Sequence, residues 1–217
     1  MRFTFNIWFM YFLGIDIASD NPGYSIIKDS KDIVFSKTIK TPKDQKGSEI
    51  LKCIFQREVL QKILSLKDFS AICVEAPAFS FSNRMVSIGM IHGALLPDVI
   101  KTGIPTVYCP PTKWKYALLG KGNADKKEGE SFVIDNFRFS SGLDLSKFDN
   151  NQADAAMLAH IAYVFKCYID NSEIYFLPGT EERVREIFTS QKYGSSKKSG
   201  ILYRKNEFYF NCNLLWE

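Results

Sequence analysis

Three acidic residues lie next to apolar segments, where an ionised side chain destabilises the fold unless it has a partner. Asp16 ends an apolar N-terminal run, Glu75 ends the apolar segment SAICVE, and Asp154 opens the apolar stretch ADAAMLAHIA. A carboxylate in an apolar setting destabilises a fold unless it is paired or bound to a metal ion. Carboxylates without His or Cys select a hard cation, Mg²⁺ or Mn²⁺. The three acids are therefore candidate metal ligands.

Each acid also has a purely structural interpretation. Asp154 could stabilise a helix N-terminus through its charge, Glu75 could turn to solvent after its strand, and Asp16 could cap the turn IASDNPG. All three interpretations would have to hold by accident, whereas one shared site explains the acids together. If the strands that end at Asp16 and Glu75 are neighbours, the two side chains meet at the carboxyl end of the sheet, where open α/β sheets place their sites.

The hydrophobic pattern predicts the elements that would position these acids. Three short apolar runs joined by turns predict an antiparallel meander, and later strands alternate with helices. This order predicts an α/β fold, with a mixed five-stranded sheet made of the meander followed by parallel strands, and with helices on both faces. The expected strands are 11–16, 23–28, 33–39, 70–75 and 105–109, and the expected helices are 48–66, 83–101, 112–119, 126–136, 153–169 and 180–190, with a polar loop at 140–151.

The length of the chain, its apolar runs and its cysteines limit how it can be organised. Its 217 residues predict one domain over 1–170, with residues 1–9 as an N-terminal extension, and a C-terminal appendage over 171–217. The apolar run at 3–15 is too short to span a bilayer and lacks the cleavage site of a signal peptide. The five cysteines are scattered without a C-x-x-C pair, which disfavours a disulfide framework or a zinc site. We therefore expect a cytoplasmic protein.

Basic residues are concentrated around the segment GKGNADK. The net charge of +4 is compatible with a polyanionic partner but is common among soluble proteins. The clustering is more informative, because glycines interleave the lysines beside the proposed acidic site. A solvated charged surface is the alternative, but we favour contacts to the phosphates of a polyanionic partner, which would weaken as salt rises. The lysines are Lys113, Lys115, Lys121, Lys126 and Lys127.

Four segments, in this order, resemble the RuvC-type Holliday junction resolvases of the ribonuclease-H-like superfamily. The opening LGIDIASDNPGYSII is similar to the first motif of that family, and VEAP is similar to its second carboxylate motif. The run YCPPTKWKYALLGKGNADK resembles its strand–helix–loop segment, and NNQADAAMLAH resembles its final acidic helix. The similarity covers residues 11–168. The abundance of Lys, Ile, Phe and Asn and the short, divergent motifs indicate a viral or phage-like member, which would act in the host cytoplasm.

The resemblance implies a structure-selective DNA endonuclease that resolves Holliday junctions. The reaction would be two-metal phosphodiester hydrolysis that leaves nicks with a 5′ phosphate. Asp16, Glu75 and Asp154 would hold two Mg²⁺ ions in each active site, and Mn²⁺ could replace them. Asp16 would bridge the two ions.

The sequence departs from the family pattern at the fourth catalytic position. Asn151 stands there, where bacterial members carry Asp. An Asn side chain offers a carbonyl oxygen to a metal ion but no charge. The nearby Asp149 could supply the missing charge, or Asn151 could reflect a natural or engineered attenuation of activity. The residues Ile17 and Ala18 also replace a Pro-Gly pair, which changes the turn after Asp16 but not the ligand.

The resemblance also implies contacts to branched DNA and to a second subunit. Lys115 and Lys126 fall on DNA-contacting lysines of the family. Phe79 and Phe81 occupy a Ser-rich segment where these resolvases place an aromatic residue that stacks on unpaired bases, although packing beneath the loop is an equal alternative. The small residues of the helix at 83–101 imply a two-fold homodimer, which would place two active sites on the two symmetric strands of a four-way junction.

Three other functions compete with junction resolution. A broader nuclease could remove branches at forks, flaps or Y-structures. A catalytically attenuated ribonuclease-H-like module that only binds DNA is kept open by Asn151. The segment GIDIAS also resembles the first phosphate loop of the actin and sugar-kinase ATPases, but this chain is short for that two-domain fold and contains no Gly-Gly pair.

Overall fold

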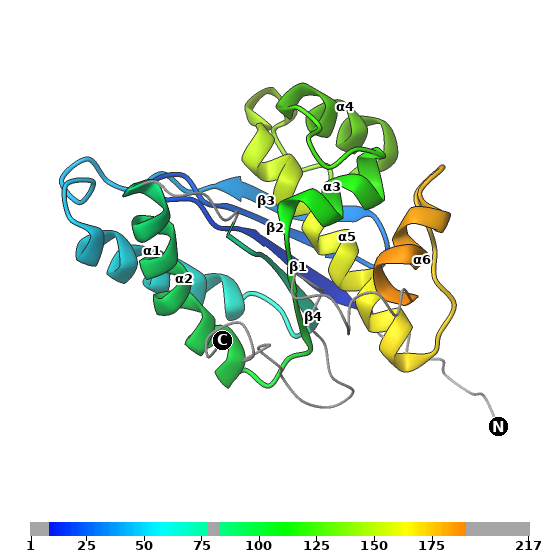
Figure 1. Cartoon of the computed structure of the whole chain (residues 1–217), viewed down its shortest axis with the longest axis horizontal. Helices are drawn as coiled ribbons and strands as arrows, with labels where there is room; N and C mark the ends of the chain where they lie inside the picture. The colour runs from blue at the N-terminus through cyan, green and yellow to red at the C-terminus, as the bar shows by residue number, and fades with distance from the viewer. Residues whose placement is uncertain (1–8, 78–82, 190–217) are drawn as a thin grey trace.

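The computed structural model describes residues 9–77 and 83–189, which fold around one mixed six-stranded sheet (Figure 1). The strands are β1 (Tyr11–Asp16), β2 (Gly23–Lys28), β3 (Asp32–Thr38), β4 (Phe69–Glu75), β5 (Thr106–Cys109) and β6 (Arg138–Phe139). They lie in the order β5-β4-β1-β2-β3-β6, with β1, β2 and β3 as the expected antiparallel meander and the other three strands in parallel pairings. The mixed sheet is confirmed, but the prediction of five strands is wrong, because the two residues of β6 are too few to show a periodic pattern.

Helices cover both faces of the sheet, as predicted (Figure 1). One face is covered by α1 (Glu49–Leu64) and α2 (Asn83–Lys101). The other is covered by α5 (Asn150–Asp170), against which α3 (Pro111–Leu119), α4 (Lys126–Asn136) and α6 (Glu181–Thr189) pack. A single 3₁₀ turn, η1 (Leu145–Lys147), precedes α5. Among the described helices, none combines the length and apolar character needed to cross a membrane.

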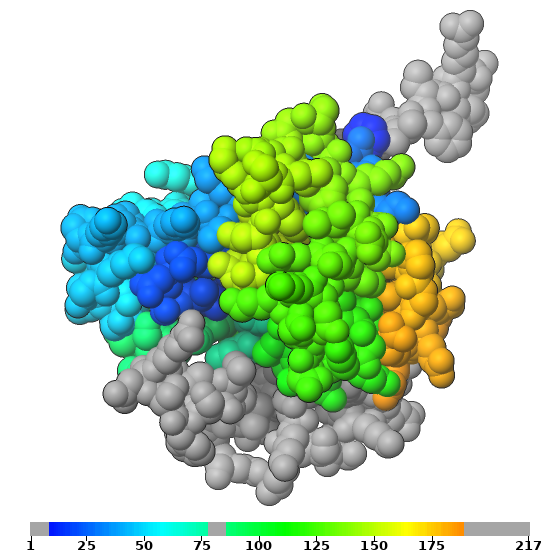
Figure 2. All heavy atoms as spheres, turned by 90° about the horizontal axis from the view of Figure 1, so that it is seen from above, coloured from blue at the N-terminus to red at the C-terminus, as the bar shows by residue number. Residues whose placement is uncertain are grey.

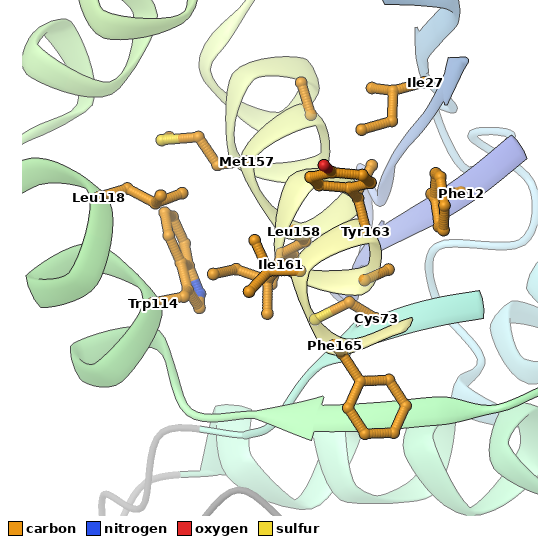
Figure 3. Close-up of a cluster of buried hydrophobic side chains, with 14 of the residues drawn as sticks. Phe12, Ile27, Cys73, Trp114, Leu118, Met157, Leu158, Ile161, Tyr163 and Phe165 are labelled. Carbon is orange, nitrogen blue, oxygen red and sulfur yellow. The ribbon is translucent and has the colours of Figure 1, made fainter. Parts of the chain in front are cut away.

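Strand alternation divides the buried residues into two cores, one on each face of the sheet. In β1, Phe12 points to the α5 side, whereas Leu13 and Ile15 point to the side of α1 and α2. Figure 3 shows the α5 side, where Trp114 of α3 packs among apolar residues of α5. The helix lies directly on the sheet, because a Cβ on Gly14 would overlap the backbone oxygen of Ala155.

The helix α5 begins earlier than the sequence prediction placed it. The loop expected to run to residue 151 ends at Asp149, which is the N-cap of α5. The Asp149 carboxylate accepts a hydrogen bond from the Gln152 backbone, and the Gln152 side chain accepts one from the Asp149 backbone. This reciprocal pair is a capping box, and it satisfies backbone donors that would otherwise lack partners. The prediction followed the apolar run alone and therefore started the helix at residue 153.

The described part of the predicted C-terminal appendage packs onto the same core. Leu177 and the α6 residues Val184, Ile187 and Phe188 are buried among the apolar residues of α5 and α3. The Arg183 side chain donates hydrogen bonds to backbone oxygens at the C-terminal end of α3. The boundary at residue 170 stays a prediction, and residues 1–8 and 190–217 lie outside the described residues.

Candidate active site

The sheet brings Asp16 and Glu75 together at one end. In β1, alternation places Asp16 on the same side as Phe12, facing α5. In β4, Glu75 shares its side with Cys73, which also faces α5. The two strands are parallel neighbours, and their register pairs Ile15 with Val74, one residue before each acid. The two carboxyl groups therefore lie side by side, and the pKa of each responds to the other.

The third acid, Asp154, projects from the second turn of α5 toward the same end of the sheet. Burial raises the pKa of Asp154 to about 7, and the charge of Asp16 adds to the increase. Burial also raises the pKa of Glu75 to about 7, with a further increase from Asp154. The pKa of Asp16 lies well above its ordinary value because the side chain is buried and faces Glu75. Three carboxyl groups thus share one poorly solvated, negatively charged location.

Lys115 of α3 provides positive charge to this location. Its Nζ lies 3.8 Å from Asp154 Oδ2, and both side chains are mostly buried. The lysine lowers the pKa of Asp16, Glu75 and Asp154 against the effect of burial. Lys126, exposed at the start of α4, acts on Asp154 in the same direction. Of the predicted DNA-binding lysines, these two therefore lie at the acidic cluster.

Trp114 is a site residue that the sequence reasoning missed. Its indole Nε1 donates a hydrogen bond of 3.1 Å to Glu75 Oε1, and its ring is fully buried. The bond favours the ionised carboxylate and lowers the pKa of Glu75 against the effect of burial. The only signal in the sequence was the position of Trp114 directly before Lys115, which did not reveal a partner 39 residues away.

The loop that follows Asp16 is held by helix α1. The fully buried Gln56 donates from Nε2 to the backbone oxygens of Ala18 (2.9 Å) and Ser19 (3.1 Å). The buried Lys52 lies 3.4 Å from the Asp20 carboxylate. These contacts anchor the turn to α1, and no local sequence pattern pointed to Gln56.

With this geometry established, comparison with known proteins identifies the family. The sequence profile described as crossover junction endodeoxyribonuclease RuvC matches residues 12–160. The chain belongs to the RuvC family. The RuvC of Synechococcus sp. (strain CC9311) is 27% identical over 159 residues, which span 69% of this chain and 96% of that protein. The RuvC of Thermotoga petrophila is 30% identical over 156 residues, which span 69% of this chain and 90% of that protein.

The fold is also that of solved RuvC structures. The structure of T. thermophilus RuvC in complex with a Holliday junction substrate superposes with a TM-score of 0.58 at 22% sequence identity. The superposition covers 70% of this chain and 91% of the T. thermophilus chain. The expected RuvC-type fold is therefore confirmed.

In this member of the RuvC family, Asn151 contacts the loop that follows Asp16. Its Nδ2 donates a hydrogen bond of 3.0 Å to the backbone oxygen of Asn21, and its Oδ1 accepts one of 2.7 Å from Asn150. A Cβ on Gly23 would overlap the Asn151 backbone oxygen, so the first turn of α5 touches the start of β2. Asp149 is occupied as well, because its Oδ1 accepts bonds from Thr38 Oγ1 and the Gln152 backbone.

The other residues predicted to contact DNA are Lys113, Lys121, Phe79 and Phe81. Lys121 forms an ion pair with Glu128 of the capping box at the start of α4. Lys113 is half-buried on α3, near the site in sequence. Phe79 and Phe81 lie outside the described residues.

The donor set suits a hard divalent cation, although it does not form a complete metal cage. Within residues 9–77 and 83–189, no three His, Cys, Asp or Glu side chains lie close enough together to enclose one ion. Burial raises the pKa values of Glu75 and Asp154, and repulsion from a neighbouring carboxylate adds to the increase. A divalent cation bound there would stabilise the ionised carboxylates. Oxygen atoms of water or of a phosphate would complete the coordination shell of Mg²⁺.

Proposed function

We propose that this chain is a Mg²⁺-dependent endonuclease that resolves Holliday junctions. Its membership of the RuvC family supports the nuclease activity, and the T. thermophilus relative was solved in complex with a Holliday junction substrate. The observation that carries the proposal is the convergence of Asp16, Glu75 and Asp154 beside Lys115, with the pKa of each acid raised by burial and by its neighbours.

The chain's own residues would prepare the reaction in three ways. Asp16, Glu75 and Asp154 would hold Mg²⁺, for which Mn²⁺ could substitute, and we propose two ions in each active site. Bound ions would supply an activated water and stabilise the leaving 3′ oxygen, so that the nick carries a 5′ phosphate. Trp114 would keep Glu75 oriented and ionised through its indole N–H. Asn151 completes the site as a neutral residue that fixes the loop after Asp16.

Lys115 and Lys126 would contact the phosphates that flank the cut. Both raise the positive potential at Asp154, so a phosphate there would meet favourable charge even before an ion binds. We include Lys113, Lys121, Phe79 and Phe81 as proposed DNA contacts that await test. A branched DNA such as a four-way junction is thus the proposed partner.

We also propose a homodimer that uses the outer side of α2. Val86 and Met90 are large apolar side chains with exposed fractions of 65% and 42%. A Cβ on Gly89 or on Gly93 would meet no atom within 4 Å, so this side of the helix can accept a close neighbour. Exposed apolar groups beside small residues are typical of a contact surface. Light scattering of the native chain, compared with Met90→Glu, would measure the oligomeric state.

The decisive experiment measures Mg²⁺-dependent nicking of a mobile four-way junction by the native chain, with Asp16→Asn as the inactive control. Three-way, fork and flap substrates in parallel separate junction resolution from broader debranching. The expected result is nicking of the four-way junction at symmetric positions, lost in Asp16→Asn. Tight junction binding without any nicking would favour the attenuated DNA-binding module instead.

A further inference from the structure

A groove opens between the end of β3 and the chain that leads into α5. Its volume is about 730 Å³. Seen from above in Figure 2, the light-blue chain after β3 lies beside the yellow-green chain before α5, with the green α3–α4 segment beyond. Apolar side chains contribute much of the lining, and lysines stand among them. The lining includes Lys37, Lys40, Leu145 and Phe148.

The groove carries positive charge from lysines that can bind an anion. Lys37 and Lys40 are exposed, and neither takes part in an ion pair among the described residues. The two acids of the lining are already engaged: Asp144 binds Lys147 over 2.7 Å, and Asp149 caps α5 and accepts a bond from Thr38. The lysines are thus left to bind an anion from outside the chain.

The position of the groove relative to the acids decides what that anion can be. Asp149 lines the groove and stands five residues before Asp154 on α5, which is about 7.5 Å along the helix axis. Lys115 lies on the β4 side of the acids, because its neighbour Trp114 bonds Glu75, whereas the groove lies on the β3 side. A DNA strand cut at the acids must continue in both directions, so its phosphates reach both sides.

We propose that this groove binds the DNA strand on the β3 side of the phosphate that is cut. Lys37 and Lys40 contact backbone phosphates there, and the apolar lining takes the face of a sugar or an unpaired base. Leu145, with 51% of its surface exposed, and the half-buried Phe148 provide that lining. Aromatic and apolar faces accept any base, so the contact adds affinity without sequence preference. This inference rests on the proposed function, because it names where the substrate continues.

The test measures junction binding rather than cleavage. The full chain carrying Asp16→Asn is titrated onto a fluorescent four-way junction in Mg²⁺ at several KCl concentrations, with and without Lys37→Glu/Lys40→Glu. We expect binding to weaken about 10-fold or more and the slope of log affinity against log salt to fall by about 2, as for two lost phosphate contacts. Leu145→Glu should weaken binding in the same direction, because it places negative charge in the groove.

The matched control is Lys62→Glu/Lys67→Glu, which changes the net charge equally. These lysines lie near the C-terminal end of α1 and before β4, at the end of the sheet opposite to the acids. A hydroxyl-radical footprint should lose protection on one side of the cut position only in the groove variants. Equal weakening by the control pair, or an unchanged footprint, overturns the inference. If the native chain binds junctions but does not nick them, the proposed nuclease function is wrong. The groove proposal is still tested in that case, because binding and footprinting do not require nicking.

Discussion

The indole N–H of Trp114 donates to Glu75 Oε1 over 3.1 Å, and this bond joins helix α3 to the end of strand β4. The donor favours the ionised form of Glu75, whose pKa burial has raised to about 7. One side chain of α3 thus tunes a carboxylate of the sheet, while its neighbour Lys115 approaches Asp154. Helix α3 therefore controls the ionisation of the site from one side.

Replacing Trp114 with Phe keeps an aromatic ring and removes the donor. We expect the pKa of Glu75 to rise further, so that nicking requires a higher pH, with a loss of roughly 10-fold at pH 7. Stability should fall by about 1–3 kcal/mol. A pH–rate profile of junction nicking measures the shift. The buried neighbour Leu118 supplies the control: Leu118→Ala should destabilise the fold without moving the profile.

Asp16→Asn should raise the stability of the metal-free protein while abolishing nicking. Folded-state pKa values above the ordinary ones mean that stability is full at low pH and is lost as pH rises through about 7 for Glu75 and Asp154. Removing the Asp16 charge relieves this repulsion by on the order of 1–2 kcal/mol. The measurement is the melting temperature in EDTA at pH 6 and pH 8.

Addition of Mg²⁺ should raise the melting temperature of the native chain more than that of Asp16→Asn. An ion that binds only the folded state stabilises it, and the gain grows with the logarithm of the ion concentration above the Kd. The native chain should gain several degrees at pH 8, and Asp16→Asn should gain much less. An equal gain in the two proteins would show that the ion binds elsewhere.

The acids were predictable from sequence, but their supporting residues were not. Asp16 and Glu75 each end a buried strand, and the period of two in a strand decides which face a side chain takes. Trp114 and Gln56 act through hydrogen bonds to residues 39 and 38 positions away, and such partners depend on tertiary packing. The early start of α5 could have been predicted, because Asp149 and Gln152 have the spacing of a capping box.

Gln56→Met should weaken the loop that follows Asp16. Methionine fills a similar volume but donates no hydrogen bond to the oxygens of Ala18 and Ser19. Leaving buried carbonyl groups without a donor costs about 1–3 kcal/mol. We expect a lower melting temperature and a higher Mg²⁺ concentration for half-maximal nicking. Gln61→Met, which removes an exposed bond to Asp98 on the outer surface, should change neither the Mg²⁺ requirement nor the nicking rate.

The two histidines should make the fold sensitive to mild acid. Burial lowers the pKa of His160 from 6.5 to about 4, and the pKa of His92 likewise. The unfolded chain therefore takes up protons first, so stability is full above about pH 6.5 and is lost as pH falls toward 4. His160→Asn keeps a donor for the Ser30 oxygen and removes the titration. Chemical unfolding between pH 7 and pH 5 should show a smaller loss in the variant, even though its stability at pH 7 is lower by roughly 2 kcal/mol.

Asn151→Asp tests why this member of the RuvC family carries an amide at the fourth position. Aspartate has no N–H to donate to the Asn21 oxygen, and it would add negative charge beside Asp16 and Asp149. We expect the metal-free protein to lose about 1–3 kcal/mol of stability and nicking to fall roughly 10-fold, with an unchanged Mg²⁺ requirement. Asn136→Asp is the matched control. It removes a similar hydrogen bond, from the Asn136 side-chain amide to the Phe132 oxygen on α4, and makes the same change of charge.

A fall in nicking confined to Asn151→Asp would establish that the amide positions the loop that follows Asp16. Faster nicking at low Mg²⁺ would contradict this prediction and would show that the missing charge limits the native enzyme. The two outcomes are separable because a positioning residue alters the rate at saturating Mg²⁺, whereas an added metal ligand alters the Mg²⁺ concentration needed to reach that rate.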